Sequence, residues 1–375
     1  MNALKILHCH STFSLGGKEA RAVRLMNSFG KDADHTILSA MPEALSARDA
    51  IDSGVKVSFP GKAAPALHGK PGLSRYRALS RYMAQFDLVL TYNWGSMDAV
   101  AARRVYGKGC PLLIHHEDGF NADEVERLNW KRNAFRRLML PAVHKVVVPS
   151  QRLESIAHDV WKQPSGRVQR ISNGIPVNHY AIGPVAGSIP GFVRMPDDVV
   201  VGTLAGLRGV KNLPRLVRAV AAQPANVKLV IVGEGPERDA ILAEAARCGM
   251  TDRLLMPGFL PDPHLYIGHF DIFALSSDSE QFPISLVEAM AAGLPAVATD
   301  VGDVKRILSH GNQPYVVPVS DEGGFAKALS ELKSNVTLRT ELGSENRVFA
   351  GANYDEARMI ADYTALYLSA LRPVR

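Results

Sequence analysis

Residues 227–248 read VKLVIVGEGPERDAILAEAARC: a short apolar run, a glycine-rich turn and an amphipathic stretch. The apolar run Val227–Val232 predicts a strand, and the GEGP segment at 233–236 marks the turn that follows it. The stretch 236–248 predicts a helix. A strand that leads through a tight turn into a helix is the repeating unit of a parallel sheet covered by helices.

The same order of elements recurs along the chain. Phe86–Tyr92 (FDLVLTY) is a nearly continuous apolar run between polar residues, as expected for a strand buried on both faces. Further apolar runs predict strands at 5–9, 35–39, 55–59, 111–115, 145–148, 199–206, 254–256 and 272–274. Helical patterns lie at 18–29, 124–140, 151–161, 213–222, 283–292 and 355–371. This alternation predicts an α/β fold with parallel sheets.

Length and composition point to two folded domains. The chain has 375 residues, of which 46% are hydrophobic and 21% charged, which excludes a disordered or collagen-like protein. The length exceeds what one hydrophobic core usually holds. The segment 182–196 is rich in glycine and proline, and we predict that it links the two halves. The formal net charge of +6 is mild and does not by itself indicate nucleic-acid binding, so we expect no nucleic-acid partner.

The cysteines and the N-terminal sequence bear on the compartment. Cys9, Cys110 and Cys248 are far apart and odd in number, which suggests a reducing environment. The N-terminal residues lack the long apolar core and the small-residue cleavage site of a secretory signal. No stretch reaches the ~18 apolar residues that a membrane-spanning helix needs. We therefore expect a cytoplasmic protein that does not span a membrane.

The segment 276–308, SSDSEQFPISLVEAMAAGLPAVATDVGDVKRIL, carries the most specific chemistry. Glu280 lies before a helix that Pro283 opens, and Glu288 lies inside that helix, with seven residues between the two carboxylates. The first backbone N–H groups of such a helix suit a phosphate or sugar oxygen, and a carboxylate one turn inside suits the two hydroxyls of a ribose. Taken alone, however, two glutamates are more often a capping acid and a solvated helix residue.

The pattern EQFPxSLxEAMAxGxP at 280–295 resembles the signature of the retaining glycosyltransferases of family 4, which have the GT-B fold. Other segments are similar to further motifs of that family, in the same order: Gly16-Gly17-x-Glu19, 170–180, 210–219 and 229–242. The resemblance covers nearly the whole chain. It implies two Rossmann-like parallel-sheet domains that face each other across a cleft: an acceptor-side domain (1–185 plus 353–375) and a nucleotide-sugar domain (186–352).

The resemblance also implies roles for particular residues. By position, Glu288 would bind the donor ribose, Glu280 the hydroxyls of the transferred sugar, and Lys211 the donor diphosphate. The other donor-binding positions it implies are Gly16, Gly17, Gly206, Gly233, Glu234, Phe282, Pro283, Ile284, Ser285 and Leu286. The implied reaction is transfer of a hexose with retention of the anomeric configuration, in which Glu280 orients the sugar and is not a covalent nucleophile.

One position departs from the family pattern. The family usually has an arginine five residues before the lysine, where this chain has Gly206. Arg208 is two residues further along, and we hypothesise that it reaches the same phosphates. If nothing replaces the arginine, a non-catalytic nucleotide-sugar-binding protein becomes the alternative. A sugar-nucleotide epimerase with the GT-B fold is a second alternative.

Histidines follow a predicted strand in the first half. PLLIHHEDGF at 111–120 puts His115 and His116 at the carboxyl end of that strand, which is the edge where ligands bind in parallel sheets. The resemblance implies that one of them acts near the donor sugar, and the sequence does not separate the two. Joint binding of a metal is disfavoured here and at His8–His10, because neighbouring strand residues point to opposite faces.

We also expect no required metal in the second half. The order Asp278-Ser279-Glu280 superficially resembles the metal motif of another glycosyltransferase fold, but the family motif already gives Glu280 a role. The nucleotide-diphosphate sugar is then a co-substrate, and no cofactor is needed.

The stretch 124–140 mixes basic with bulky apolar residues, and two interpretations stay open. It is either an amphipathic helix with its apolar side on the sheet and its basic side (Arg127, Lys131, Arg132, Arg136 and Arg137) in water, or a surface that docks on an anionic bilayer. The second would place the protein peripherally at the inner face of the membrane. The resemblance further implies a saccharide or lipid-linked acceptor in cell-surface polysaccharide or lipopolysaccharide assembly.

Overall fold

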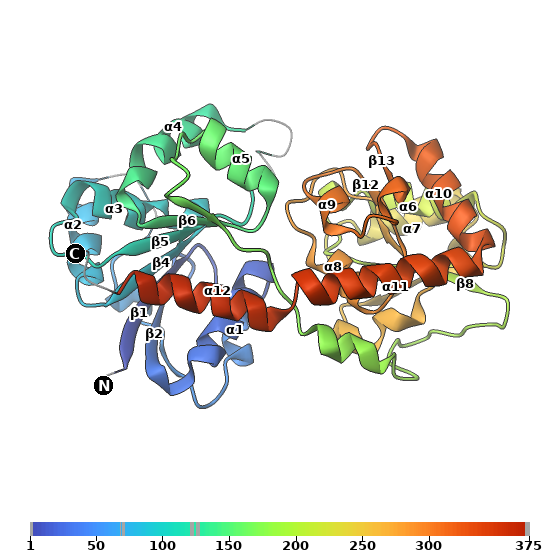
Figure 1. Ribbon diagram of the computed structural model, residues 1–375, viewed down its shortest axis with the longest axis horizontal. Helices are drawn as coiled ribbons and strands as arrows, with labels where there is room; N and C mark the ends of the chain where they lie inside the picture. The colour runs from blue at the N-terminus through green and yellow to red at the C-terminus, as the bar shows by residue number, and fades with distance from the viewer. Residues whose placement is uncertain (1–2, 68, 70–71, 121–123, 125–127, 372–375) are drawn as a thin grey trace. The chain divides into compact units, whose positions relative to one another are not determined.

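The computed structural model describes residues 3–67, 69, 72–120, 124 and 128–371 (Figure 1). The chain divides into two compact units, and each has its own parallel sheet. Unit 1 comprises 1–172 and 358–375, and unit 2 comprises 173–357. The sequence places the corresponding boundaries at 185/186 and 352/353. The α/β fold class with two parallel sheets is confirmed.

Unit 1 is built on a seven-stranded sheet in the order β3-β2-β1-β4-β5-β6-β7, in which all neighbours are parallel. The strands are β1 (Leu4–His10), β2 (Ala33–Ser39), β3 (Lys56–Ser58), β4 (Leu88–Tyr92), β5 (Leu113–His116), β6 (Lys145–Val148) and β7 (Val168–Arg170). The helices are α1 (Gly17–Phe29), α2 (Leu73–Met83), α3 (Met97–Tyr106), α4 (Trp130–Met139), α5 (Gln151–Asp159) and nearly all of α12 (Glu356–Ser369). Alternate strand residues serve opposite faces: Ile6 shares a core with Tyr363 of α12, and Leu7 shares one with Leu79 of α2.

Unit 2 has a six-stranded sheet in the order β10-β9-β8-β11-β12-β13, again parallel throughout. The strands are β8 (Val199–Leu204), β9 (Val227–Val232), β10 (Leu254–Gly258), β11 (Ile272–Leu275), β12 (Ala296–Thr299) and β13 (Val316–Val317). The helices are α6 (Leu213–Ala221), α7 (Arg238–Arg247), α8 (Ile284–Ala291), α9 (Val304–Ile307), α10 (Glu322–Ser334) and α11 (Val336–Asn353). Val200 packs in the core that contains Leu286 of α8, and Val201 in the core that contains Leu216 of α6.

Each sheet has a point where the strand order reverses. In unit 1 the chain winds outward from β1 to β2 and β3, then continues on the other side of β1 with β4. In unit 2 the same reversal lies between β8 and β11. Because the loops that leave the two central strands separate to opposite faces, a crevice forms at their carboxyl ends, and this is where open α/β sheets bind ligands.

Two sequence-based expectations need correction. The segment 182–196 is not a free linker but lies inside unit 2, where Ile189 is buried and the Val185 N–H donates to the Leu265 carbonyl at 2.7 Å. Its glycines and prolines give an irregular backbone, but that backbone still packs against the rest of unit 2. The helix expected over 124–140 is α4 at 130–139, and residues 125–127, Arg127 included, lie outside the described residues.

The strands β7, β12 and β13 were not predicted, because they are short and carry little periodic signal. Within the part of the chain that the structure describes, none of the helices combines the length and apolar character needed to cross a bilayer.

Candidate functional site

The reversal point of unit 2 brings together the lysine and the first glutamate of the sequence motifs. Lys211 follows β8, in a short helical turn (Gly209–Lys211), and Glu280 follows β11. The Lys211 Nζ donates to Glu280 Oε1 at 2.5 Å, and the Ser277 hydroxyl donates to the same oxygen at 2.7 Å. The side chains of Lys211 and Glu280 are 19% and 9% exposed. The pair therefore lies at the ligand-binding edge of the sheet, largely sheltered from solvent.

Asp278 ties together the two loops that carry this pair. Its carboxylate accepts from Arg215 Nη1 at 2.8 Å and from Asn212 Nδ2 at 3.1 Å. Its backbone N–H donates to the Val210 carbonyl at 2.8 Å. Asn212 has φ +43 and caps α6 with its side chain, which turns the chain sharply after Lys211. Asp278, two residues before Glu280, thus holds the loops in place.

The second glutamate and the helix start are also near this edge. Pro283 precedes α8, and the N–H groups of Ile284 and Ser285 lie in its first turn, where a helix offers no internal acceptors. Glu288 lies one turn further in and is half-buried. Its Oε1 accepts from the Tyr180 hydroxyl at 3.1 Å. A buried tyrosine therefore orients this carboxylate, so Glu288 is not an ordinary solvated helix residue.

The glycine loop after β9 packs against the loop after β8. Gly233 and Gly235 have φ +143 and +154, a region that favours glycine, and added side chains there would collide with the backbone of Ala205 and Leu207. The Leu207 N–H donates to the Glu234 carbonyl at 2.8 Å. The glycines of the opening sequence thus let the backbones of the two loops approach each other.

Arg208 lies beside the position where the family arginine is missing. A Cβ added to Gly206 would be 3.4 Å from Arg208 Nε and 3.7 Å from its Nη2, so the Arg208 side chain folds back over Gly206. Arg208 is exposed, and it forms no ion pair with any of the residues that the structure describes. The Arg208 guanidinium therefore lies close to where the first atoms of a side chain at position 206 would be.

Gly16 and Gly17 lie at the start of α1 in unit 1. Gly16 has an extended backbone and Gly17 is the first helical residue, and both are exposed. Their backbone conformations do not require glycine. The lack of side chains instead leaves the exposed start of the helix open to a close approach by another group.

An ion pair that sequence reasoning missed lies on the same helix. Arg21 donates to both oxygens of Asp118, which follows β5, and the Nη2–Oδ2 distance is 2.8 Å. The Asp118 N–H donates to Asn93 Oδ1 at 2.7 Å. Burial works against the charged carboxylate, but the charge of Arg21 and its hydrogen bonds outweigh it and lower the pKa of Asp118. The carboxyl edge of unit 1 therefore holds a charged, well-anchored carboxylate.

The two candidate histidines are both buried in unit 1. His116 has Nδ1 at 3.1 Å from the Thr91 carbonyl and Nε2 at 3.0 Å from the Tyr367 hydroxyl. His115 has Nδ1 at 2.9 Å from Thr91 Oγ1, and its Nε2 is 3.5 Å from Glu117. The rings point to opposite faces of the sheet, as alternation requires. Neither ring reaches the surface.

A wider cluster of buried imidazoles surrounds Tyr92. His8 Nδ1 lies 3.2 Å from the Tyr92 hydroxyl, and its Nε2 lies 3.0 Å from His35 Nδ1. His10 stacks on the Tyr92 ring. Burial lowers the pKa of His35 to about 4 and that of His116 to about 3, and it lowers the pKa of His8 and His10 well below the usual value. These rings are therefore neutral at physiological pH.

Helix α4 departs from the amphipathic pattern that its sequence suggested. Arg136 is fully buried, donates to Glu117 at 3.1 Å and lies over the rings of Trp94, Phe120 and Trp161. Conversely, two large apolar side chains of α4 face solvent, since Trp130 and Leu138 are 72% and 59% exposed. The expectation that the basic residues would all face water is wrong for Arg136, whose charge is paired inside unit 1.

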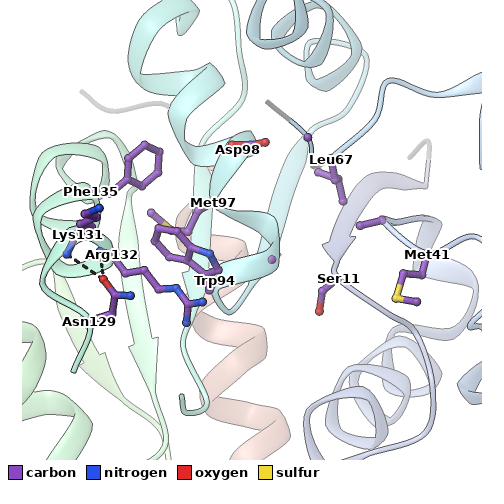
Figure 2. Close-up of a pocket in the computed structure, with 13 residues that line it drawn as sticks. Ser11, Met41, Leu67, Trp94, Met97, Asp98, Asn129, Lys131, Arg132 and Phe135 are labelled. Atoms are coloured by element: carbon purple, nitrogen blue, oxygen red, sulfur yellow. Dashed lines mark hydrogen bonds between the residues drawn. The ribbon is translucent and has the colours of Figure 1, made fainter. Parts of the chain in front are cut away.

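Unit 1 also contains a pocket at its own reversal point. Its cavity volume is about 590 Å³, and its walls come from the loops after β1, β2 and β4 and from α3 and α4. Figure 2 shows Trp94, Arg132 and Phe135 on one side and Ser11, Met41 and Leu67 on the other. No sequence motif pointed to it, because its residues are scattered between positions 11 and 135.

The comparisons with known proteins agree with this architecture. Residues 192–349 match the family model of glycosyl transferases group 1, and residues 15–179 match that of glycosyltransferase family 4. The putative glycosyltransferase EpsD of Bacillus subtilis is 26% identical over 83% of this chain and 84% of its own length. The N-acetyl-alpha-D-glucosaminyl L-malate synthase of Bacillus anthracis is 26% identical, and the match covers 60% of each protein.

Solved structures with the same fold include several glycosyltransferases. HepE of Anabaena in complex with UDP superposes with a TM-score of 0.80 over 98% of this chain and 100% of that protein, at 18% identity. WaaG, a glycosyltransferase involved in lipopolysaccharide biosynthesis, superposes with a TM-score of 0.70 over 96% of this chain and 99% of that protein, at 15% identity. At these identities the likeness concerns the fold.

Proposed function

Because the chain belongs to the group 1 and family 4 glycosyltransferases, we propose that it transfers a sugar from a nucleotide-diphosphate sugar to a saccharide or lipid-linked acceptor. The observation that carries the proposal is the Lys211–Glu280 contact at the reversal point of unit 2, beside the start of α8. Unit 2 then binds the donor and unit 1 the acceptor. The pathway we propose is assembly of cell-surface polysaccharide or lipopolysaccharide.

The donor is held by groups that match its parts. The ribose hydroxyls bind Glu288, whose carboxylate Tyr180 orients. The hydroxyls of the transferred sugar bind Glu280, whose second partner is the Ser277 hydroxyl. The loops at 205–208 and 233–235 let backbone approach the nucleotide closely. UDP-glucose is the first donor to test, since HepE has been solved with UDP-glucose bound.

The electrostatic demand of the reaction falls on the leaving diphosphate. When the anomeric carbon separates from the phosphate, negative charge grows on the leaving oxygen and positive charge on the sugar. Lys211, Arg208 and the first N–H groups of α8 stabilise that phosphate. Since Lys211 pairs with Glu280, the diphosphate competes with Glu280 for the ammonium group, which frees Glu280 for the sugar. These charges make a metal unnecessary, so we expect turnover to persist in a chelator.

In unit 1 we assign positioning roles to the histidines. His115 and His116 are buried and hydrogen-bonded, and they fix the end of β5 from which Glu117 and Asp118 emerge. Asp118, locked by Arg21, lies at the edge that the acceptor approaches. The acceptor proton leaves with the departing phosphate, and attack on the front face retains the configuration.

A membrane surface is the partner we propose for the helices of unit 1. Besides the buried Arg136, helices α2, α3 and α4 carry eight basic residues against one acid, Asp98, which Arg75 neutralises at 2.6 Å. Exposed Trp130 and Leu138 add apolar contact area on α4. Basic and bulky apolar groups together suit an anionic bilayer, where lipid-linked acceptors reside. The protein then acts peripherally at the inner face of the membrane.

The proposed function is tested by donor binding followed by turnover. UDP-, GDP- and ADP-glucose are screened for a rise in melting temperature, because a donor that binds only the folded chain stabilises it by mass action. With the donor so found, Lys211→Ala should lower kcat by about 100- to 1000-fold, since it removes charge at the leaving group. Lys327→Ala, an exposed lysine on α10, is the matched control.

The same assay separates the alternatives. Free nucleoside diphosphate that appears only when an acceptor is present supports transfer and excludes an epimerase. Donor binding without turnover over a broad acceptor panel would favour the non-catalytic alternative. Near-normal turnover of Lys211→Ala would contradict the assignment of the diphosphate site.

A further inference from the structure

The pocket at the reversal point of unit 1 has a lining that a plain saccharide does not need. Leu67, Met97 and Phe135 line it together with the indole of Trp94. A sugar hydroxyl buried against such side chains loses its hydrogen bonds to water without replacement, which costs free energy. An apolar group buried there leaves water without losing hydrogen bonds, which is favourable. The walls therefore favour an apolar part of a ligand.

The Trp94 ring already contacts two arginines of α4: Arg132, which lines the pocket, and the fully buried Arg136, which is not among the lining residues. The Arg132 guanidinium lies 5.4 Å from its centroid and that of Arg136 lies 5.2 Å from it. Arg136 is paired with Glu117, and Arg132 with Glu124 at 2.8 Å. Because these pairs hold the indole in place, the pocket is preformed.

The rim of the pocket carries a cation without an acidic partner. Lys131, at the start of α4, is exposed, and it forms no ion pair with any residue in the described ranges. The one acid among the lining residues, Asp98, is paired with Arg75. The surroundings have the same sign, since unit 1 holds 28 Lys and Arg against 16 Asp and Glu, a net charge of 28 − 16 = +12. An anion is therefore favoured at the rim beside the apolar interior.

We propose that this pocket binds an acceptor that is an anionic amphiphile, with its apolar group among Trp94, Met97 and Phe135 and its phosphate at Lys131. The proposal rests on the proposed function, because it names the class of acceptor that unit 1 receives. The volume of about 590 Å³ is in the range of pockets that enclose one small organic group. The position at the carboxyl ends of β1 and β4 leaves the sugar of such an acceptor at the ligand-binding edge.

Binding is tested on the full chain without any donor. Decyl phosphate, decyl glucoside and inorganic phosphate are titrated by calorimetry below the micelle concentration of each amphiphile. Decyl phosphate should bind with one-to-one stoichiometry, decyl glucoside at least ~10-fold more weakly, and inorganic phosphate without saturation. Equal affinity for the two amphiphiles, or no binding of decyl phosphate, would overturn the proposal.

Two matched substitutions on α4 locate the site. Lys131→Glu should weaken decyl phosphate binding about 10-fold or more, while Arg137→Glu, the same charge change at an exposed position outside the pocket, should leave it within about twofold. An equal loss in both variants would mean a non-specific charge effect and would refute the pocket. Lys131 and Arg137 are both exposed, so neither change threatens folding.

The source of the amphiphile is decided by a transfer assay, once a donor is known. The same sugar is offered on a polyprenyl diphosphate in vesicles, on decyl phosphate in solution and on neutral decanol. Preferential use of either anionic acceptor over the neutral one supports the proposal. Which of the two anionic acceptors is used identifies the natural acceptor as lipid-linked or soluble. If no nucleotide sugar binds, the proposed function fails, yet the decyl phosphate titration still tests the pocket.

Discussion

The two units share an architecture and differ in charge. Unit 1 has a net charge of 28 − 16 = +12, whereas unit 2 has 15 Lys and Arg against 21 Asp and Glu, a net charge of 15 − 21 = −6. The mild +6 of the whole chain hides this division. Net charge is thus informative only once the fold has assigned each residue to a unit. Local charge, and not the total, indicates which partner each unit meets.

The two ligand-binding edges are also built differently. The edge of unit 2 consists of glycine turns, a helix start and the partly exposed pair Lys211–Glu280. Among the residues that the structure describes, unit 1 instead buries five histidines, His8, His10, His35, His115 and His116, whereas none of the four in unit 2 is buried. Groups that touch a common ligand are constrained by its chemistry and form motifs. Groups that support a variable pocket are constrained only by packing, so they leave little pattern.

The largest effect should come from removing the buried charge of unit 1. Arg136→Met leaves Glu117 buried without its partner, which should lower the free energy of unfolding of unit 1 by about 3–5 kcal/mol. All three tryptophans, Trp94, Trp130 and Trp161, lie in unit 1, so tryptophan fluorescence in a denaturant titration follows this unit alone. Arg137→Met, at the next and exposed position, is the control. Equal stability of the two variants would show that the pair contributes nothing.

Acid should destabilise unit 1 before unit 2. The folded-state pKa of His35 is about 4 and that of His116 about 3, below the value of roughly 6.5 in an unfolded chain, so between these limits the unfolded state binds more protons. Stability is therefore present above pH 6.5 and is lost as the pH falls toward 4, by on the order of 2–3 kcal/mol for His35. The measurement is the tryptophan-detected unfolding free energy against pH.

A variant pair assigns that acid response to particular histidines. His35→Gln should flatten the pH dependence of unit 1, whereas His310→Gln, at an exposed position in unit 2, should leave it unchanged. A midpoint that stays constant from pH 7 to pH 5 in the unaltered protein would contradict the burial of neutral rings as the cause.

A smaller effect is expected at the one departure from the family motif. Arg208→Ala should lower kcat about 10-fold, because one of two side-chain cations for the leaving phosphate is lost while Lys211 remains. Arg306→Ala removes an exposed arginine elsewhere in unit 2 and should have no effect. Gly206→Arg in the Arg208→Ala background should restore part of the rate. Unchanged turnover of Arg208→Ala would contradict the hypothesis that Arg208 replaces the family arginine.

The smallest effect is expected in binding to anionic vesicles, which tests the difference in net charge between the two units. Arg137→Glu should reduce partitioning onto vesicles with anionic lipid about fivefold or more, since each basic group near such a surface contributes about 1 kcal/mol. Lys305→Glu makes the same change on unit 2 and should matter less. Flotation at low and high salt measures both. If the unaltered protein does not float with anionic vesicles even at low salt, unit 1 is not a membrane-docking unit.

The resemblance of short segments to family motifs singled out Lys211, Glu280, Glu288 and the 233–235 turn as the proposed donor residues. The structure brings Lys211 and Glu280 into contact. The structure added the contacts of Tyr180, Ser277 and Asp278. These residues lie in segments that the sequence had singled out, but the sequence did not show which side chains they meet. It also revised two expectations that rested on composition: the 182–196 segment packs inside unit 2, and Arg136 lies in the core of unit 1.

The sequence by itself determined the parallel α/β fold, because strand, turn and helix signals act over a few residues, and its motifs marked the segments that we propose bind the donor. Only the tertiary structure decided which charges are buried, which imidazoles stack on Tyr92 and which side chains enclose the pocket beside Trp94. Several of these features join residues far apart in the chain, such as His10 with Tyr92 or Ser11 with Phe135, and their energies depend on burial and distance. The burial of a side chain and its distance from its partners are set only when the sheet has formed.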